Sequence, residues 1–483
     1  MYLKRLLSIA AGIGAFALAA CDKDPSAPTA NFALTACPTG DLQVNSPISL
    51  DFTQGIQPST VSGANIVVTD ARTGVEVPGS LTLAPSGQQI SFAPSAPLPF
   101  GAILSIRVQN LVNANGSTQL GVIVCNVRTQ AAPITEVIWD RLDSPTGTNL
   151  TSASLFAPDS GWVSSFAVPL YRRIGTGWQV RFNQPYFLSS FDVRFISATH
   201  GWGAHFDQRR NRGVITQTLD GTTFDTSFTL ASQDIRRLRI DSIAGTGNQI
   251  WGVAGGGTST NVQLLKLDPV SRGWFATTNI SGTSSIADID HAPGDTTTLY
   301  AVSGGFRLGG STPLIFSGRV FNSTNGGAAW AEVPNARADS TSTVVFRGVA
   351  RRSNGDVYVA GGNGFFGRLP SGNAPYVKIN LGVLSRDTTD YNALIFQDVQ
   401  FAPDNDNIGW VVGAQLIGIQ NGVPQYQGLI FGTTDGGTTW TRQGVRGADE
   451  YGAAFPALNR LDVWSSTQAW AVGDGGIVIS LHP

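Results

Sequence analysis

The feature that most constrains the fold of this chain is a short pattern that recurs along its last two thirds. Each copy has a strand with apolar alternation, a turn, and an aromatic residue followed by small or β-branched residues and glycine. The mean separation of about 51 residues fits one four-stranded propeller blade with its loops. Seven copies predict seven blades, or six or eight if one copy is a coincidence. The aromatic residues are Trp162, Trp202, Trp251, Tyr300, Tyr358, Trp410 and Trp470.

A second motif is expected in the hairpin turn between the third and fourth strands of a blade. It occurs at Ser323–Trp330 (STNGGAAW) and Thr433–Trp440 (TTDGGTTW), with a degenerate copy at Thr218–Phe224. This sequence matches the Asp-box of bacterial neuraminidase-type (BNR) repeats, which is a structural turn and no evidence of a sialidase site. An Asp or Asn accepts turn N–H bonds, a glycine adopts positive φ, and a tryptophan covers the blade. The residues in these roles are Asp220, Asn325, Gly326, Trp330, Asp435, Gly436 and Trp440.

The order of the recurring pattern, the Asp-box and the tryptophan resembles the photosystem II stability and assembly factor family of propellers. Openings such as Phe191–Phe195 (FDVRF) and Phe396–Phe401 (FQDVQF) add to the resemblance, which covers roughly residues 135 to 483. It implies the fold more than the function, because many bacterial members occur in non-photosynthetic lipoproteins. An Ig-like companion domain is also not part of the photosynthetic pattern.

The two ends of the propeller region, residues 134–483, complement each other. The last repeat has strands near Leu461, at Trp470 and at Gly476–Ser480, with no fourth strand after them. The segment Glu136–Arg141 (EVIWDR) imitates the sequence that follows an Asp-box elsewhere in the chain. We therefore predict that Glu136–Arg141 completes the last blade and removes two exposed strand edges.

Residues 34–130 predict a separate β-sandwich of about seven short strands. Alternating segments such as Ile48–Phe52 and Leu104–Val108 are punctuated by Gly and Pro at short intervals. The region resembles the bacterial Ig-like domains of S-layer and other surface proteins, which implies a spacer or stalk without chemistry of its own. The resemblance is carried by Pro58–Val61, Ile90–Pro94, Pro97–Gly101, Val108–Leu111 and Asn115–Gly116.

The first twenty residues predict the compartment. Lys4 and Arg5 precede an apolar run that is too short to span a bilayer comfortably and is typical of a signal peptide, residues 1–20. The run ends in LAA followed by Cys21, which resembles the lipobox of bacterial lipoproteins and implies acylation of Cys21 and anchoring in a membrane. An ordinary signal peptide with a free Cys21 is the alternative. Residues 21–33 then form a lipidated cysteine and a flexible tether in the bacterial cell envelope, facing the periplasm or the exterior.

The two remaining cysteines, Cys37 and Cys125, are expected to form a disulfide in that oxidising compartment. Closing a loop of 88 residues (125 − 37) stabilises by about 4–5 kcal/mol in the chain-entropy model. Two buried thiols are the alternative.

The 57 glycines, 25 prolines and only 13% charged residues favour all-β structure. The net charge of −2 and the lack of a basic run argue against a nucleic-acid partner.

The serious enzymatic alternative is a sialidase or a related glycosidase. A sialidase needs three arginines, a tyrosine nucleophile with a glutamate base, and an aspartic acid. Of the four glutamates, only Glu450 falls in a plausible loop. Tyr171–Ile174 resembles the sialidase Arg-Ile-Pro element only weakly, because the proline is absent, and no aspartate pair is marked out for glycoside hydrolysis. We therefore assign no catalytic residues.

No cofactor and no metal site are predicted. The four histidines, His200, His205, His291 and His482, lack metal-ligand spacing. The glycine-rich stretches Gly255–Gly257 and Gly361–Gly364 follow copies of the recurring pattern and are expected to be blade turns instead of phosphate loops.

Arginines provide the candidate binding residues, since Arg outnumbers Lys 27 to 4. Several are expected in loops on one propeller face, which also receives the long inserts 303–318 and 413–428. The alternative is a set of scattered, solvated arginines on irregular loops. The candidates are Arg209, Arg210, Arg212, Arg236, Arg237 and Arg307.

The sequence therefore predicts an all-β lipoprotein in which an Ig-like β-sandwich precedes a seven-bladed β-propeller. We expect a monomer that binds a protein or glycan partner in the envelope, without catalysis, through one face of the propeller. The alternative is a carbohydrate-active enzyme or lectin that uses the central pocket. A structural role in the envelope without a defined ligand comes third. Propellers host all three kinds of function, so the fold does not choose among them.

Overall fold

The computed structural model describes residues 31–481 with internal gaps. The predicted signal peptide, Cys21 and most of the tether lie outside the described residues, as do Glu450 and His482. The gaps are 40, 72–73, 118, 131–132, 134–135, 167, 183–187, 242–248, 256–260, 269–270, 272, 282–284, 310–311, 338–343, 373–374, 384–392 and 447–454.

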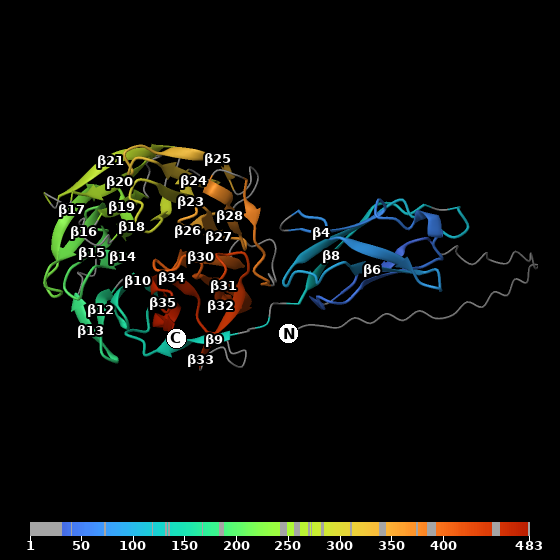
Figure 1. Ribbon diagram of the computed structural model, residues 1–483, viewed down its shortest axis with the longest axis horizontal. Helices are drawn as coiled ribbons and strands as arrows, with labels where there is room; N and C mark the ends of the chain where they lie inside the picture. The colour runs from blue at the N-terminus through green and yellow to red at the C-terminus, as the bar shows by residue number, and fades with distance from the viewer. Residues whose placement is uncertain are drawn as a thin grey trace, which may run out of the picture.

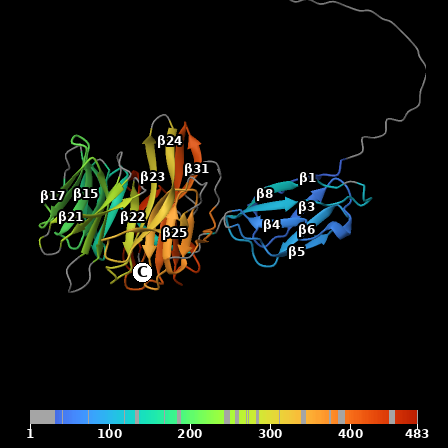
Figure 2. The same ribbon diagram turned by 90° about the horizontal axis from the view of Figure 1, so that it is seen from above.

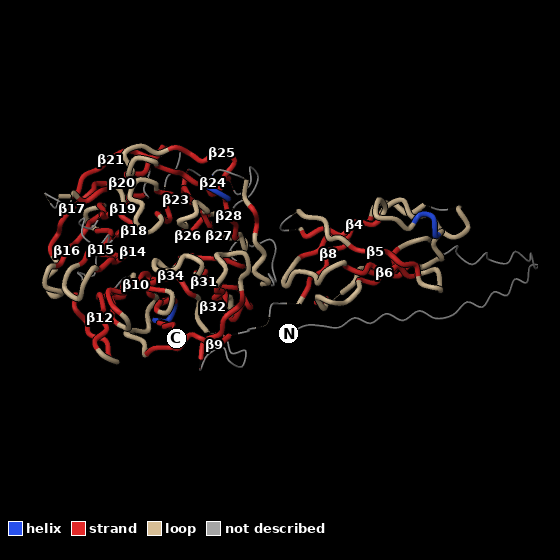
Figure 3. The backbone as a smooth tube through the Cα atoms, viewed as in Figure 1, coloured by secondary structure: helices blue, strands red, loops and turns tan. Residues whose placement is uncertain are grey.

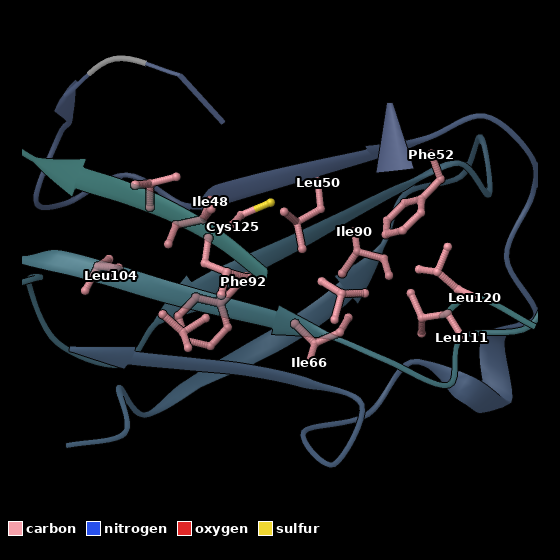
Figure 4. Close-up of a cluster of buried hydrophobic side chains, with 14 of the residues drawn as sticks. Ile48, Leu50, Phe52, Ile66, Ile90, Phe92, Leu104, Leu111, Leu120 and Cys125 are labelled. Atoms are coloured by element: carbon pink, nitrogen blue, oxygen red, sulfur yellow. The ribbon is translucent and has the colours of Figure 1, made fainter. Parts of the chain in front are cut away.

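The N-terminal domain is a sandwich of two four-stranded sheets. The alternation in strands such as Ile48–Phe52 places every second side chain in the core between the sheets (Figure 4). One sheet has the order β1 (Leu34–Ala36), β3 (Ile48–Phe52), β6 (Gln89–Pro94) and β5 (Gly79–Leu83). The other has the order β2 (Asp41–Leu42), β8 (Ile123–Thr129), β7 (Ile103–Val108) and β4 (Ile66–Asp70).

A disulfide joins Cys37, which follows β1, to Cys125 in β8, as predicted. The two Cα atoms are 5.5 Å apart, within the usual range for a disulfide. Cys125 is fully buried in the sandwich core, where Figure 4 places it beside Ile48. The bond therefore ties the first strand of the domain to its last strand.

The strands from β9 onward form a ring of four-stranded groups, with first strands at the centre and fourth strands at the periphery (Figure 1). The first strands are β10 (Leu150–Ala157), β14 (Leu188–Phe195), β18 (Asp234–Asp241), β22 (Ile286–His291), β26 (Phe346–Arg351), β30 (Leu394–Phe401) and β34 (Leu458–Ser465). The second strands are β11 (Ser160–Ser165), β15 (Gly201–Asp207), β19 (Gln249–Gly255), β23 (Leu299–Gly309), β27 (Val357–Gly361), β31 (Gly409–Gln420) and β35 (Gln468–Gly473).

The third and fourth strands form the outer half of each group. The third strands are β12 (Val168–Ile174), β16 (Arg212–Thr218), β20 (Asn261–Leu267), β24 (Thr312–Ser323), β28 (Phe366–Leu369), β32 (Val423–Thr433) and β36 (Val478–Leu481). The fourth strands are β13 (Gly177–Phe182), β17 (Asp225–Ala231), β21 (Trp274–Ser281), β25 (Ala331–Arg337), β29 (Val377–Lys378), β33 (Thr441–Arg446) and β9 (Glu136–Leu142). The described residues thus contain seven four-stranded groups.

The recurring aromatic residues of the sequence all lie in second strands, one in each group. Each is buried against a neighbouring strand or blade, which is why the sequence keeps a large ring at this position. Trp162, for example, stacks on Phe195 of the next group with ring centroids 4.1 Å apart.

The ring closes through β9, as predicted. β9 pairs antiparallel with β36 and also runs parallel beside β33, so it joins the last two groups into one eight-stranded sheet. Trp139 of β9 is fully buried and donates a hydrogen bond from Nε1 to Oε1 of Gln443, at 2.9 Å.

The two ends of the ring differ. On one end, the hairpins β23–β24 and β31–β32 project beyond the other groups (Figure 2), and we call this end the hairpin face. On the other end, first strands turn into second strands and third strands into fourth strands, and we call this end the pocket face.

Almost all regular structure is strand (Figure 3). Among the described residues, the helical segments are single 3₁₀ turns at Pro58–Thr60, Pro370–Gly372 and Asp474–Gly476. None of the helices in this part of the chain has the length and apolar character needed to cross a bilayer.

Candidate binding pocket at the propeller axis

Each first strand carries a register shift just before the residue that reaches the axis of the ring. In β18, for example, the shift lies between Ile235 and Arg237, so Arg236 is the extra residue of a bulge. Neighbouring arginines therefore occupy opposite environments: Arg236 is half-exposed, and Arg237 is only 2% exposed. The equivalent positions in the seven groups are Ser152, Asp192, Arg237, Asp288, Gly348, Asp398 and Arg460.

Arg237 is the centre of a buried ionic cluster that spans four groups. Its Nε lies 2.6 Å from Oδ1 of Asp288. Its Nη1 lies 3.6 Å from Oδ2 of Asp192, and its Nη2 lies 3.6 Å from Oδ2 of Asp398. A side chain can reach carboxylates on three other first strands only at the axis, so this cluster fills the middle of the propeller.

The electrostatics of the cluster follow from burial and pairing. Burial alone would lower the pKa of Arg237, but Asp288, Asp192 and Asp398 outweigh burial and hold it above its ordinary value. Burial raises the pKa of Asp398 despite the opposing effect of Arg237. Arg194 lies 3.8 Å from Asp192 and Arg460 lies 4.0 Å from Asp398, so two further arginines flank the cluster.

The same carboxylates also cross-link the first strands. Oδ2 of Asp192 accepts the N–H of Leu238 at 2.8 Å. Oδ2 of Asp288 accepts the N–H of Val349 at 3.1 Å, and Oδ2 of Asp398 accepts that of Leu461 at 3.1 Å. Each bond joins one group to the next, so the cluster has a structural role and is not a free acid–base site.

Two residues further along six of the first strands, and three residues further along β26, the axis opens into a cavity of about 300 Å³ on the pocket face. Residues of all seven first strands line it, so the cavity is enclosed around its whole circumference. Its polar walls include Arg194, Arg239, Asp290, Gln400 and Asp462, and its rim includes Phe401 and Trp464.

The carboxylates of this cavity are held by structural contacts. Asp462 accepts the N–H of Leu155 at 2.6 Å and pairs with Arg194 at 3.2 Å. Asp290 accepts the N–H of Arg351 at 2.7 Å and pairs with Arg239. Burial raises the pKa of both carboxyls even though the arginines oppose it.

Asp406 is the third carboxylate in the lining. It accepts the N–H and hydroxyl of Ser353 and lies 3.4 Å from Nη2 of Arg352. Burial opposes these contacts, but together they lower the pKa of Asp406.

Two groups in the cavity have unused binding capacity. Arg239 pairs with Asp290, but its side chain remains 25% exposed and its guanidinium has five N–H donors. Trp464, at the end of β34, is 41% exposed at the rim. A partly exposed donor and an exposed aromatic side chain can both contact a bound molecule.

The arginines singled out from the sequence do not gather in this cavity. Arg209 and Arg210 lie in the turn between β15 and β16, on the hairpin face, and Arg212 begins β16. Their turn surrounds buried Asp207, which accepts the N–H groups of Arg209 and Arg210 and pairs with Arg210 and Arg212 at 3.2 and 3.4 Å. These arginines therefore satisfy a buried carboxylate.

The remaining predicted arginines fall in strands instead of loops. Arg307 lies in β23. Arg236 and Arg237 lie within β18, not before it. Arg236 pairs with Asp234 at 2.8 Å, and Arg237 is at the axis. The expectation of a surface loop was wrong for Arg237, because a bulge turns this side chain inward and three carboxylates compensate its charge.

The predicted Asp-box segments form turns between third and fourth strands on the pocket face. Oδ1 of Asn325 accepts the N–H of Ala329 at 2.8 Å, and Oδ1 of Asp435 accepts that of Thr439 at 2.9 Å. Gly326 and Gly436 have φ values of 69° and 73°, which favour glycine. In the degenerate copy, Asp220 accepts the N–H groups of Thr222 and Thr223, both at 2.7 Å. These hydrogen bonds lie within the turns themselves, so the Asp and Asn side chains have a structural role.

His205 has a structural environment as well. It is fully buried between Ser190 Oγ and Thr216 Oγ1, at 2.7 and 2.8 Å from its ring nitrogens. Burial lowers its pKa to about 3, so the ring is neutral at physiological pH.

The sequence analysis named Arg237 but missed the other axis residues, although a signal exists. The residues of the ionic cluster lie 10 to 14 positions before the recurring aromatic residue of their group. A second set follows two positions later and includes Arg194, Arg239, Asp290, Gln400 and Asp462. These separations vary with the length of the turn between the first and second strands, so aligning the repeats on their aromatic residues does not bring the charged residues into one column. The signal in the sequence is only that charged residues recur 8 to 14 positions before the aromatic residue.

Comparisons with known proteins give a fold and a domain type. Residues 24–121 match the bacterial Ig-like domain family. No curated protein matches the chain. A solved structure described as YCF48 bound to D1 peptide is 15% identical, with a TM-score of 0.50, covering 73% of this chain and all of that one.

Two further solved structures have lower TM-scores. YCF48 from Cyanidioschyzon merolae is 13% identical, with a TM-score of 0.47, over 72% of this chain and 99% of that one. A GH74 enzyme from Niastella koreensis is 15% identical, with a TM-score of 0.47, over 71% of this chain, which spans 53% of the enzyme. The comparisons and the strand order together show an all-β chain in which a bacterial Ig-like domain precedes a β-propeller.

Proposed function

We propose that this chain is a non-enzymatic binding module whose ligand enters the cavity on the pocket face. The observation that carries the proposal is the convergence of all seven first strands on one cavity that has a partly exposed Arg239 and an exposed Trp464. Enclosed cavities with a few convergent polar groups are the usual form of ligand sites. The similar fold of YCF48, which was solved with a D1 peptide, supports a binding role for a propeller of this kind.

The glycosidase alternative needs two carboxyl groups that are free to act as acid and as base or nucleophile. In the cavity, Asp290 and Asp462 each accept a backbone N–H from the next group and pair with an arginine. Asp406 is occupied by Ser353 and Arg352. Their contacts favour structural roles over proton transfer, so binding without catalysis is the better explanation of this cavity.

Incubation with polysaccharides of the native envelope distinguishes binding without catalysis from glycoside hydrolysis. We expect the wild-type protein to retain envelope material and to release no new reducing ends. Retention should fall in Trp464→Ala and persist in Phe166→Ala, because Phe166 is a similarly exposed aromatic residue in the β11–β12 turn on the hairpin face. Hydrolysis that disappears in Asp290→Asn or Asp462→Asn would instead identify an enzyme.

We further propose that the module is a lipoprotein of the bacterial envelope. In this proposal residues 1–20 are removed as a signal peptide, and Cys21 is acylated. Residues 21–33 form the tether, and the sandwich of residues 34–130 is a spacer before the propeller of residues 134–483. The match to bacterial Ig-like domains and the Cys37–Cys125 disulfide, which is typical of extracytoplasmic proteins, support this arrangement.

Replacing Cys21 with serine should block acylation and release the protein from membranes. Acyl chains contribute about 0.8 kcal/mol per buried methylene, so their loss removes the anchor. Membrane fractionation after carbonate and salt washes measures the effect, with the wild-type chain as the reference. A Cys21→Ser protein that stays in the washed membranes would contradict the lipoprotein proposal.

A further inference from the structure

We propose that the cavity on the pocket face takes the end of an uncharged saccharide, with one sugar ring packed against Trp464. The inference rests on the proposed function of this cavity and names its ligand class. It follows from the charge balance of the lining, the hydrogen-bond donors and acceptors within it, and the shape of the cavity.

The lining carries equal numbers of basic and acidic side chains. A ligand with a net charge would lose its hydration and meet as much repulsion as attraction, which makes its burial costly. Sugar hydroxyls donate and accept hydrogen bonds, so they can use both kinds of side chain without carrying a charge. Apart from His291, the ionisable residues of the lining are Arg194, Arg239, Arg351, Asp290, Asp406 and Asp462.

Arg239 and Asp462 provide a complementary donor and acceptor. Arg239 pairs with Asp290 through Nη2, and its side chain, which is 25% exposed, keeps further N–H donors. Each carboxylate oxygen of Asp462 accepts one hydrogen bond, from Arg194 or from the N–H of Leu155, and keeps a further lone pair. Both side chains line the cavity. A hydroxyl there can accept from Arg239 while another donates to Asp462.

Trp464 adds an apolar surface at the mouth of the cavity. It is 41% exposed, more than any other tryptophan in the described part of the chain. A sugar ring presents C–H groups on one face and hydroxyls at its edge, so it can cover the indole while its hydroxyls reach the polar wall. An aromatic wall beside mixed hydrogen-bonding groups therefore fits a saccharide better than an apolar ligand.

The shape of the cavity favours a compact ligand. All seven first strands surround it, and its volume is about 300 Å³. An extended peptide lying across the face would need an open groove, and a chain terminus entering end-on would bring a charge into a balanced site. One or two sugar units at the end of an oligosaccharide match both the enclosure and the neutrality.

Calorimetry and saturation-transfer NMR with defined oligosaccharides test the inference. The probes are neutral hexose and N-acetylhexosamine oligosaccharides of two to six units, uronic-acid oligosaccharides of equal length, and an uncharged hexapeptide. The full chain is compared with Trp464→Ala, Arg239→Lys and Phe166→Ala. Arg239→Lys keeps the charge opposite Asp290 but removes the planar guanidinium with its additional N–H donors, and Phe166→Ala is the exposed aromatic control on the hairpin face.

We expect at least one neutral oligosaccharide to bind, with affinity reduced about tenfold or more in Trp464→Ala and Arg239→Lys and unchanged in Phe166→Ala. If only the acidic oligosaccharides or the peptide bind, and Trp464→Ala weakens them, the saccharide inference is wrong while the binding function stands. If retention of envelope material is unaffected by Trp464→Ala, the cavity is not the binding site, and both proposals fail. If envelope material is retained through Trp464 but no probe binds, the saccharide inference alone is overturned.

Discussion

Replacing Arg237 with methionine is expected to destabilise the propeller by about 3–5 kcal/mol, because it leaves buried carboxylates without their cation. Arg237 is 2% exposed and pairs with Asp192, Asp288 and Asp398. Arg236→Met is the matched control. Arg236 directly precedes Arg237 in the same strand, and its side chain is half-exposed and paired with Asp234. Loss of this arginine should therefore destabilise the propeller by no more than about 1 kcal/mol.

The defect of Arg237→Met should depend on pH. Burial already raises the pKa of Asp398, and without the opposing effect of Arg237 its folded-state pKa rises further above the unfolded value of about 3.9. A folded state with raised pKa values binds more protons than the unfolded state, so stability falls as pH increases through that window. The difference between variant and wild type should therefore be larger at pH 8 than at pH 5.

Urea unfolding of the propeller at both pH values, followed by tryptophan fluorescence, measures these effects. The cluster would have no stabilising role if Arg237→Met unfolded at the same urea concentration as Arg236→Met. Equal losses at pH 5 and pH 8 would show that the aspartates are not the cause.

Removing the chain up to Arg141 should prevent stable closure of the ring, whereas removing it only to Thr129 should leave the propeller folded. The longer truncation takes away nearly all of β9, which pairs with both β36 and β33. Two strand edges and the core around Trp410 would then be exposed.

A point variant separates closure from chain length. Trp139 is fully buried, hydrogen-bonded to Gln443, and 6.0 Å from Trp410 between ring centroids. Trp139→Ala should cost about 3–5 kcal/mol, as is typical for a large buried aromatic residue. Thermal unfolding of the two truncated chains and of Trp139→Ala provides the test. Equal melting temperatures for both truncations would rule out closure by β9.

Much of the fold could be predicted from local sequence patterns. The recurring aromatic residues marked the second strands, because each group needs one large ring between neighbouring sheets. The alternation in Ile48–Phe52 and Leu104–Val108 marked sandwich strands with one buried face. The closing strand was predictable because Glu136–Arg141 has the pattern of a fourth strand.

The candidate site was much less predictable. Arg236 and Arg237 are adjacent and chemically identical, so no local pattern separates the half-exposed side chain from the buried one. The bulge between Ile235 and Arg237 decides their directions, and pairing with β19 sets that bulge. The binding candidates taken from the sequence therefore pointed to the hairpin face, while the lined cavity lies on the pocket face.

By itself the sequence determined the all-β class, the two-part organisation, the repeat and its closing strand, because these depend on periodicity and turn chemistry within short segments. The tertiary structure alone decided which charged residues meet. Arg237 finds Asp192, Asp288 and Asp398, and Arg239 shares a cavity with Asp462, only because the ring brings distant first strands to one axis. At that axis, burial makes unpaired charge costly, so the pairing of residues far apart in the chain fixes both the core of the propeller and the shape of its pocket.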